Sequence, residues 1–201
     1  MVVVPAVAQA GAALSAGPNI PGQVTVGTTV PAAVSIINDS ANIVLGEAGY
    51  DTDSFRIDDI TVVPSCGSQA ILADCPVGFR DPGVLIPSPL TAIGRAGTAC
   101  GGRNFAISLI DAAQGKYRFT VSGANVVLGP RGASASAPPS ARCIIDYTAN
   151  VLRQPTIDSN PNPGLQTDQK ASVATVDVGP TNTGQPATGT GTVATTVLAA
   201  P

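Results

Sequence analysis

The chain contains no histidine and no tryptophan, and its 201 residues include only two lysines, Lys116 and Lys170, and one glutamate, Glu47. Charged residues make up 11% of the sequence, against about 25% in an average soluble protein. Without histidine, the Ser-His-Asp and Cys-His arrangements of nucleophilic catalysis are excluded. The arginines are scattered singly and the formal charge is −3, so the clustered positive charge that nucleic-acid binding requires is missing.

Other catalytic and membrane signatures are also missing. Neither lysine belongs to a Ser-x-x-Lys motif, which argues against a serine–lysine pair. No apolar run approaches the roughly 18 residues that a membrane-spanning helix needs. We therefore expect a non-enzymatic protein without a transmembrane segment and without a nucleic-acid partner.

The first twenty residues leave two interpretations open. The stretch "MVVVPAVAQAGAALSAG" is apolar and contains Ala8-Gln9-Ala10, which matches the small-x-small site of a signal peptidase. The basic and longer apolar regions of a complete signal are missing. Residues 1–20 are thus either a leader remnant or arm, or they include a first strand, and 21–201 are expected to form a single domain.

What the chain does contain indicates strands. Hydrophobic residues make up 44% of the sequence and are mostly Val, Ala and Ile, while 22 glycines and 18 prolines interrupt them. β-Branched residues fit a pleated strand better than a helix. Apolar and polar residues alternate in several stretches, namely 22–40, 55–64, 104–111, 116–123, 142–152, 170–178 and 189–199. The pattern predicts an all-β fold, a sandwich of immunoglobulin-like or jelly-roll type with about eight or nine strands.

Four cysteines, Cys66, Cys75, Cys100 and Cys143, are separated by gaps of 9, 25 and 43 positions. A zinc site usually has a Cys-x2-4-Cys knuckle and a redox site a Cys-x-x-Cys motif, and neither is present. Wide spacing and an even number favour disulfides, for which three pairings exist. We favour Cys66–Cys75 and Cys100–Cys143, which would hold the long irregular stretch from 65 to 103.

An acidic cluster, "GYDTDSFRIDD", offers the best metal candidate. Asp51, Asp53, Asp58 and Asp59 supply hard oxygen ligands of the kind that calcium prefers. The EF-hand pattern fails because its sixth-position glycine and final glutamate are missing. An Asp-rich turn before a strand and a weak calcium site both remain open, and no other cofactor is expected. As an alternative function, the protein would be a carbohydrate- or calcium-binding surface module, and these residues or the 65–103 loops would bind the ligand.

The segments "IPGQVTVGTTVPAAVSIIN" and "GTGTVATTV" resemble the opening and closing strands of bacterial cell-surface repeat domains with an immunoglobulin-like sandwich. The resemblance implies a non-enzymatic module on the outside of a bacterium, and the Ala- and Thr-rich, Lys-poor composition is also typical of bacterial proteins. Expected partners are other protein subunits or surface components. The sequence thus predicts a secreted or cell-surface structural or adhesive protein. The apolar segment "VVVPAVAQA" is a candidate for strand addition between subunits.

Overall fold

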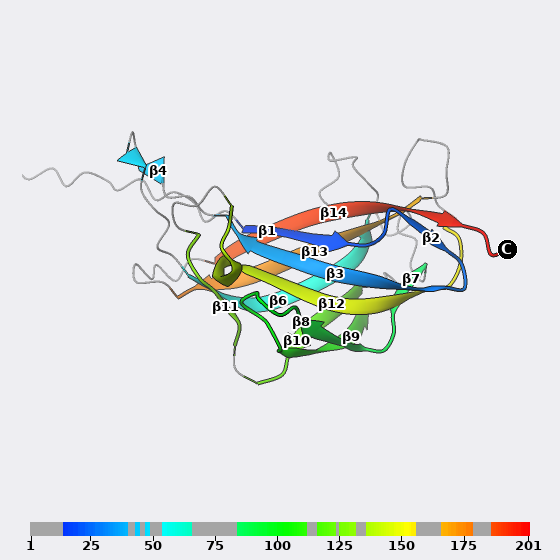
Figure 1. Ribbon diagram of the computed structural model, residues 1–201, viewed down its shortest axis with the longest axis horizontal. Coiled ribbons are helices and arrows are strands. Elements are labelled where there is room, and N and C mark those ends of the chain that lie inside the picture. The colour runs from blue at the N-terminus through cyan, green and yellow to red at the C-terminus, as the bar shows by residue number, and fades with distance from the viewer. Residues whose placement is uncertain are drawn as a thin grey trace, which may run out of the picture.

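A computed structural model of the chain describes residues 14–39, 43–44, 47–48, 54–65, 84–111, 116–123, 125–131, 136–155, 166–178 and 186–201. Apart from one turn of 3-10 helix, η3 (Pro139–Ala141), every regular element among these residues is a strand, so the all-β prediction is confirmed. The strands are β1 (Leu14–Asn19), β2 (Gln23–Thr25), β3 (Thr29–Asn38), β4 (Ile43–Val44), β5 (Glu47–Ala48), β6 (Phe55–Ser65), β7 (Leu85–Pro87), β8 (Thr91–Gly94), β9 (Asn104–Asp111), β10 (Lys116–Val121), β11 (Val127–Leu128), β12 (Arg142–Val151), β13 (Gln166–Asp177) and β14 (Pro186–Leu198) (Figure 1).

The long strands follow the alternation in the sequence. In β12 every second side chain is buried, from Cys143 through Tyr147 to Val151, because neighbouring side chains of a strand point to opposite faces. Alternating stretches that follow one another in the sequence pair as antiparallel hairpins, β9 with β10 and β13 with β14. The connector 112–115 of the first hairpin lies outside the described residues.

Twelve strands form one sheet, whose hydrogen-bonded order is β1-β3-β12-β8-β9-β10-β6-β13-β14-β2, with β7 added to β12 and β11 to β6. All of its pairs are antiparallel except β14 with β2. The remaining two strands, β4 and β5, pair with each other. Two separate sheets, as expected of a sandwich, are not formed by these strands. The reason is that β8 pairs with β12 on one edge and with β9 on the other, while β10 continues to β6.

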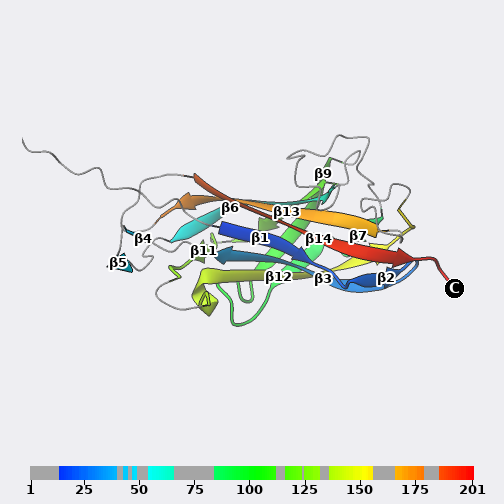
Figure 2. The same ribbon diagram turned by 90° about the horizontal axis from the view of Figure 1, so that it is seen from above.

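The first strand of this order, β1, approaches the last strand but one, β14. β1 lies beside β14 when the molecule is seen from above (Figure 2). The approach is close because β14 has glycines there: a Cβ on Gly191 would lie 2.1 Å from the carbonyl oxygen of Ala16, and one on Gly189 would lie 2.8 Å from that of Leu14. β1 falls inside the stretch 1–20, for which the sequence left both a leader and a first strand open, and residues 1–13 lie outside the described residues.

The predicted strand number is too low, because the described residues form fourteen strands. Most of the additional strands have only two to four residues, too few to show an alternation. Two of them, β7 and β8, lie in the stretch 65–103 that was expected to be irregular. Residues 66–83 of that stretch lie outside the described residues.

The core lies between the folded halves of the sheet, and half of its side chains are valine or isoleucine, among them Val34, Ile36 and Ile145. Tyr117, Phe119 and Tyr147 form an aromatic group, with ring centroids 5.3 to 6.3 Å apart in edge-to-face contact. Such pairs add about 0.5–1.5 kcal/mol beyond the area they bury. In the part of the chain that the structure describes, no helix is long and apolar enough to cross a membrane.

Candidate functional site

The loop from Arg95 to Arg103, which connects β8 to β9, is fastened to the beginning of β12. Main-chain N–H groups of Arg95 and Ala99 donate to the carbonyl oxygens of Ile144 (2.7 Å) and Arg142 (2.7 Å). The loop is also closed at its base, where Gly94 N–H donates to Arg103 O at 2.8 Å. These main-chain hydrogen bonds hold the loop against the sheet, although the loop contains no strand.

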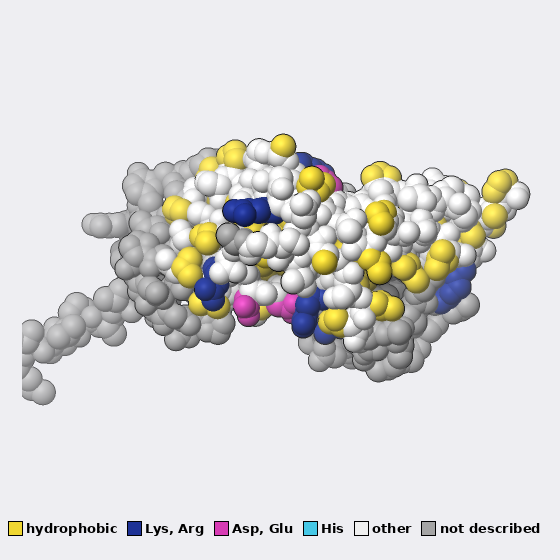
Figure 3. Space-filling view, turned by 90° about the horizontal axis from the view of Figure 1, so that it is seen from below, with side chains coloured by type: hydrophobic (Ala, Val, Ile, Leu, Met, Phe, Trp, Pro, Cys, Tyr) yellow, Lys and Arg dark blue, Asp and Glu magenta, His cyan; other side chains and the backbone are white. Residues whose placement is uncertain are grey.

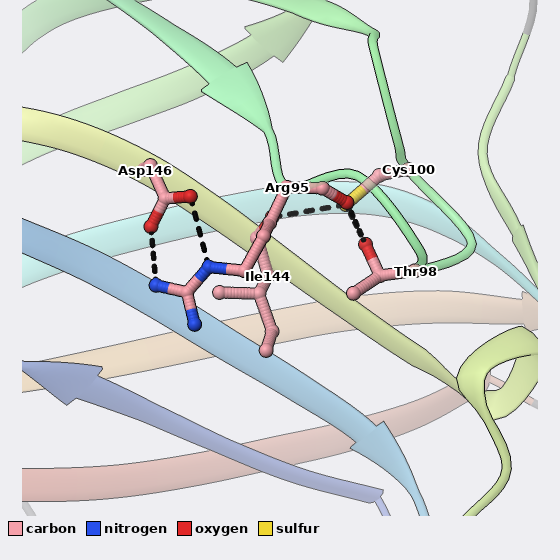
Figure 4. A network of polar contacts seen from close by, with 5 residues as sticks. All are labelled: Arg95, Thr98, Cys100, Ile144 and Asp146. Carbon is pink, nitrogen blue, oxygen red and sulfur yellow. Dashed lines mark hydrogen bonds and ion pairs between the residues drawn. The ribbon is translucent and has the colours of Figure 1, made fainter.

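A disulfide joins the loop to the sheet. Cys100 and Cys143 are bonded, with their Cα atoms 5.1 Å apart and both side chains fully buried. This is one of the two pairs favoured from the sequence. The other pair, Cys66–Cys75, lies outside the described residues. The Thr98 hydroxyl donates to Arg95 O at 2.8 Å and touches Cys100 Sγ at 3.5 Å (Figure 4).

Gly94 is what permits the loop to turn back at this point. A Cβ on Gly94 would lie 1.7 Å from the carbonyl oxygen of Cys100, far inside van der Waals contact. Gly97 and Gly102 have φ values of 75° and 71°, a backbone region that glycine enters without strain. Gly94, Gly97 and Gly102 are therefore required by the geometry of the loop rather than by flexibility.

On the outer surface, Arg95 forms a two-point ion pair with Asp146 of β12, with Nε–Oδ2 at 2.9 Å and Nη2–Oδ1 at 2.6 Å (Figure 4). The hydrogen bond to Asp146 raises the pKa of Arg95 above its usual value. Both side chains are well exposed. Water and salt screen such a pair, so it contributes about 0–1 kcal/mol and chiefly orients the two groups.

An apolar groove of about 670 Å³ lies next to this ion pair. It is formed where β8, β9 and β12 run side by side, and its lining includes Ile93, Phe105, Asp146 and Tyr147. Ile93 is 51% exposed and Leu90, just before β8, is 52% exposed. The groove thus combines an anchored loop, an ion pair and accessible apolar side chains.

A second, more polar cleft of about 660 Å³ lies over β6. Its lining includes Asp58 and Asp59 from β6, Arg118 and Thr120 from β10, and Asn125. Arg118 Nε and Asp59 Oδ1 form an ion pair at 2.8 Å. Two of the four acidic residues proposed from the sequence therefore line one cleft, and the basic residue that neutralises one of them was not predicted.

The geometry around Asp58 and Asp59 gives little support to a calcium site in the described residues. No group of three or more His, Cys, Asp or Glu side chains suited to a metal is found in the described ranges. Asp51 and Asp53 lie outside those ranges. The Arg118 guanidinium, bound to Asp59, would also repel a cation.

Arg95, Arg118 and Asp146 were not singled out from the sequence, and neither ion pair was predicted. Arg95 and Asp146 are 51 positions apart, and Asp59 and Arg118 lie on two different strands. Only the sheet order brings each pair together. No protein-family model matches this chain, and the curated proteins contain no match to it.

Proposed function

We propose that the chain is a non-enzymatic, immunoglobulin-like β-sandwich module of a secreted or cell-surface protein, with a structural or adhesive role. The strand order is the observation that carries this proposal. In immunoglobulin sandwiches with strands A to G, one sheet has the order A-B-E-D and the other contains C, F and G. We assign the letters A to G, in chain order, to β1, β3, β6, β8, β12, β13 and β14. The run β1-β3-β12-β8 then corresponds to A-B-E-D, and the run β6-β13-β14 corresponds to C-F-G.

One insertion accounts for the departure from two separate sheets. The β9–β10 hairpin follows the fourth strand of that order, pairs with β8 through β9, and pairs with β6 through β10. It therefore bridges the two sheets on one side. The immunoglobulin-like topology and the continuous sheet are compatible for this reason.

An extracellular location is supported by the disulfide between Cys100 and Cys143, because disulfides persist in oxidising compartments. The surface is consistent with contacts to other proteins rather than to nucleic acid. On the face seen from below, charged side chains are few and stand in small separate groups among apolar and uncharged side chains (Figure 3).

Recognition by this module would use the loop 95–103 and the adjoining apolar groove, since rigidly held loops on a scaffold commonly carry binding. The expected partners are other subunits of an assembly or surface components. The segment 2–10 precedes β1 and is apolar and β-branched at its start. We propose that it is donated to a neighbouring subunit by strand addition.

Deleting residues 2–12 tests assembly, because the deletion leaves β1 in place. We expect the full chain to form concentration-dependent oligomers or filaments in size-exclusion chromatography and electron microscopy, and the shortened chain to remain monomeric. A chain with Val2, Val3 and Val4 all changed to serine is the matched control of unchanged length, and it should also fail to assemble. Monomers in all three samples would contradict strand addition.

A further inference from the structure

We propose that the polar cleft over β6 binds a neutral saccharide. This site is separate from the assembly function proposed above, and neither depends on the other. The cleft lies at a break in the sheet. On one edge of β6, β10 pairs with Ile60–Val62 and β11 pairs with Phe55–Arg56, so neither strand covers the two residues Asp58 and Asp59.

The opposite edge of β6 is interrupted at the same place. β13 pairs through Ala174 with Asp59 and through Thr175 with Ile57, so the register passes over Asp58. This is a β-bulge, and such bulges redirect a side chain and commonly occur beside binding sites. Among the described residues, Asp58 thus has no register partner on either edge of β6, and the residue is exposed.

The polar side chains of the cleft retain unused hydrogen-bonding capacity. Within the described part of the chain, the carboxylate of Asp58 and the side chains of Thr120 and Asn125 make no hydrogen bond or ion pair, and all three residues are exposed. Arg118 uses Nε for Asp59, which leaves the N–H groups of its two terminal nitrogens for a ligand. Carboxylates accept hydrogen bonds, guanidinium groups donate them, and Thr and Asn side chains do both.

This mixture suits sugar hydroxyls, which act as donors and acceptors at once. The cleft is also lined by Ile57 and Val121, which are only partly buried and can contact the C–H groups of a sugar ring. The volume of about 660 Å³ falls within the range of about 300–1,000 Å³ for small-molecule sites. Two carboxylates against one guanidinium disfavour phosphate and other anions. Two carboxylates also fall short of the 6–8 oxygen ligands of calcium.

The test is calorimetric titration of the full chain with neutral β-linked oligosaccharides of glucose, N-acetylglucosamine, xylose and mannose, one at a time. We expect at least one to bind. Asp58→Ala and Thr120→Val each remove one hydrogen-bonding group from an exposed side chain, and each should weaken binding by roughly tenfold or more. Asp146→Asn, which alters the ion pair beside the other groove, is the matched control and should bind as the unaltered chain does.

Calcium chloride forms a separate arm of the titration. The proposal would be overturned if no oligosaccharide bound, or if Asp58→Ala and Thr120→Val both bound the sugar as tightly as the unaltered chain. It would also be overturned if the chain bound calcium but no sugar, and Asp58→Ala abolished the calcium binding. The shortened chain lacking residues 2–12 separates this result from assembly. It should bind the sugar with unchanged affinity whether or not the full chain assembles.

Discussion

Two tyrosine hydroxyls, those of Tyr117 and Tyr147, lie 3.2 Å apart inside the core. Burial, together with the neighbouring hydroxyl, raises the pKa of Tyr117 well above its usual value of 10.0. Burial also raises the pKa of Tyr147 to about 12, and the hydrogen bond from its neighbour only partly offsets this. Both residues are therefore neutral in the folded protein over a wider pH range than in the unfolded chain.

A raised tyrosine pKa makes stability depend on pH in one direction. The folded state favours the neutral form of Tyr147. Its contribution to the unfolding free energy is therefore complete below pH 10.0 and is lost as the pH rises toward about 12. For Tyr147 the loss amounts to roughly 2–3 kcal/mol of unfolding free energy. Chemical unfolding monitored at a series of alkaline pH values should show this decline.

Tyr147→Phe provides the comparison for the alkaline decline. It should lower the unfolding free energy by about 0.5–1.5 kcal/mol at neutral pH, because one hydrogen bond is lost. Its stability should then fall less steeply than that of the unaltered chain at alkaline pH, since one titrating group has been removed. If the unfolding free energy fell equally steeply with pH in both proteins, the pKa of Tyr147 would not be raised in the folded state.

The ion pair of Arg95 with Asp146 has the opposite character, because both partners are exposed. Asp146→Asn should change the unfolding free energy by less than about 1 kcal/mol. Thermal unfolding at low and high salt measures this change, and high salt should reduce the difference between the two proteins. A loss of several kcal/mol would mean that the pair holds the loop 95–103 in place, a role we assign to the disulfide and the main-chain hydrogen bonds.

Among the elements, β1 is the strand whose position depends most on residues far away in the sequence. It pairs with β3 and lies against Gly189 and Gly191 of β14. Gly191→Ala would place a Cβ only 2.1 Å from Ala16 O, so β1 must move. We expect a loss of about 1–3 kcal/mol and faster hydrogen exchange at the β1 amides, measured by mass spectrometry.

The control for that substitution is Gly17→Ala, at a strand position where a Cβ would meet nothing within 4 Å. Alanine is the better residue inside a strand by about 0.5–1 kcal/mol, so this variant should be as stable as the unaltered chain or slightly more stable. Unchanged exchange of β1 in Gly191→Ala would contradict the close approach of β1 and β14.

Elements that show in a local pattern of the sequence were predicted, and elements that depend on pairing with distant residues were not. The long strands β10 and β12 were predicted because alternation is local, and their buried faces follow from it. The Gly- and Thr-rich end of the chain also alternates, yet nothing local indicates that Gly189 and Gly191 make room for β1. The short strands β7 and β8 depend on pairing with β12, some 50 or more positions later. The pairs Arg95–Asp146 and Asp59–Arg118 are products of the same long-range register.

The whole molecule is organised around the hairpin that bridges the two runs of strands. The disulfide between Cys100 and Cys143 spans 43 positions, and β9, β10 and β11 all lie between its two cysteines. The covalent loop thus encloses the bridging hairpin and ends on β12, in the middle of the run β1-β3-β12-β8. The disulfide therefore restricts the conformations of the unfolded chain in the segment whose hairpin pairs with both runs of strands.

Reduction of this bond should destabilise the entire fold rather than the loop alone. In the chain-entropy model, a loop of 43 positions corresponds to about 4 kcal/mol of unfolding free energy. The measurement is guanidinium unfolding with and without reductant, in a chain with Cys66→Ser and Cys75→Ser so that only one bridge is present. We expect a single transition that moves to lower denaturant on reduction. A second transition, or a loss confined to exchange of the amides in 95–103, would mean that the bond stabilises only its loop. In that case the hydrogen bonds of β8 to β12 and of β10 to β6 would be sufficient to join the two halves.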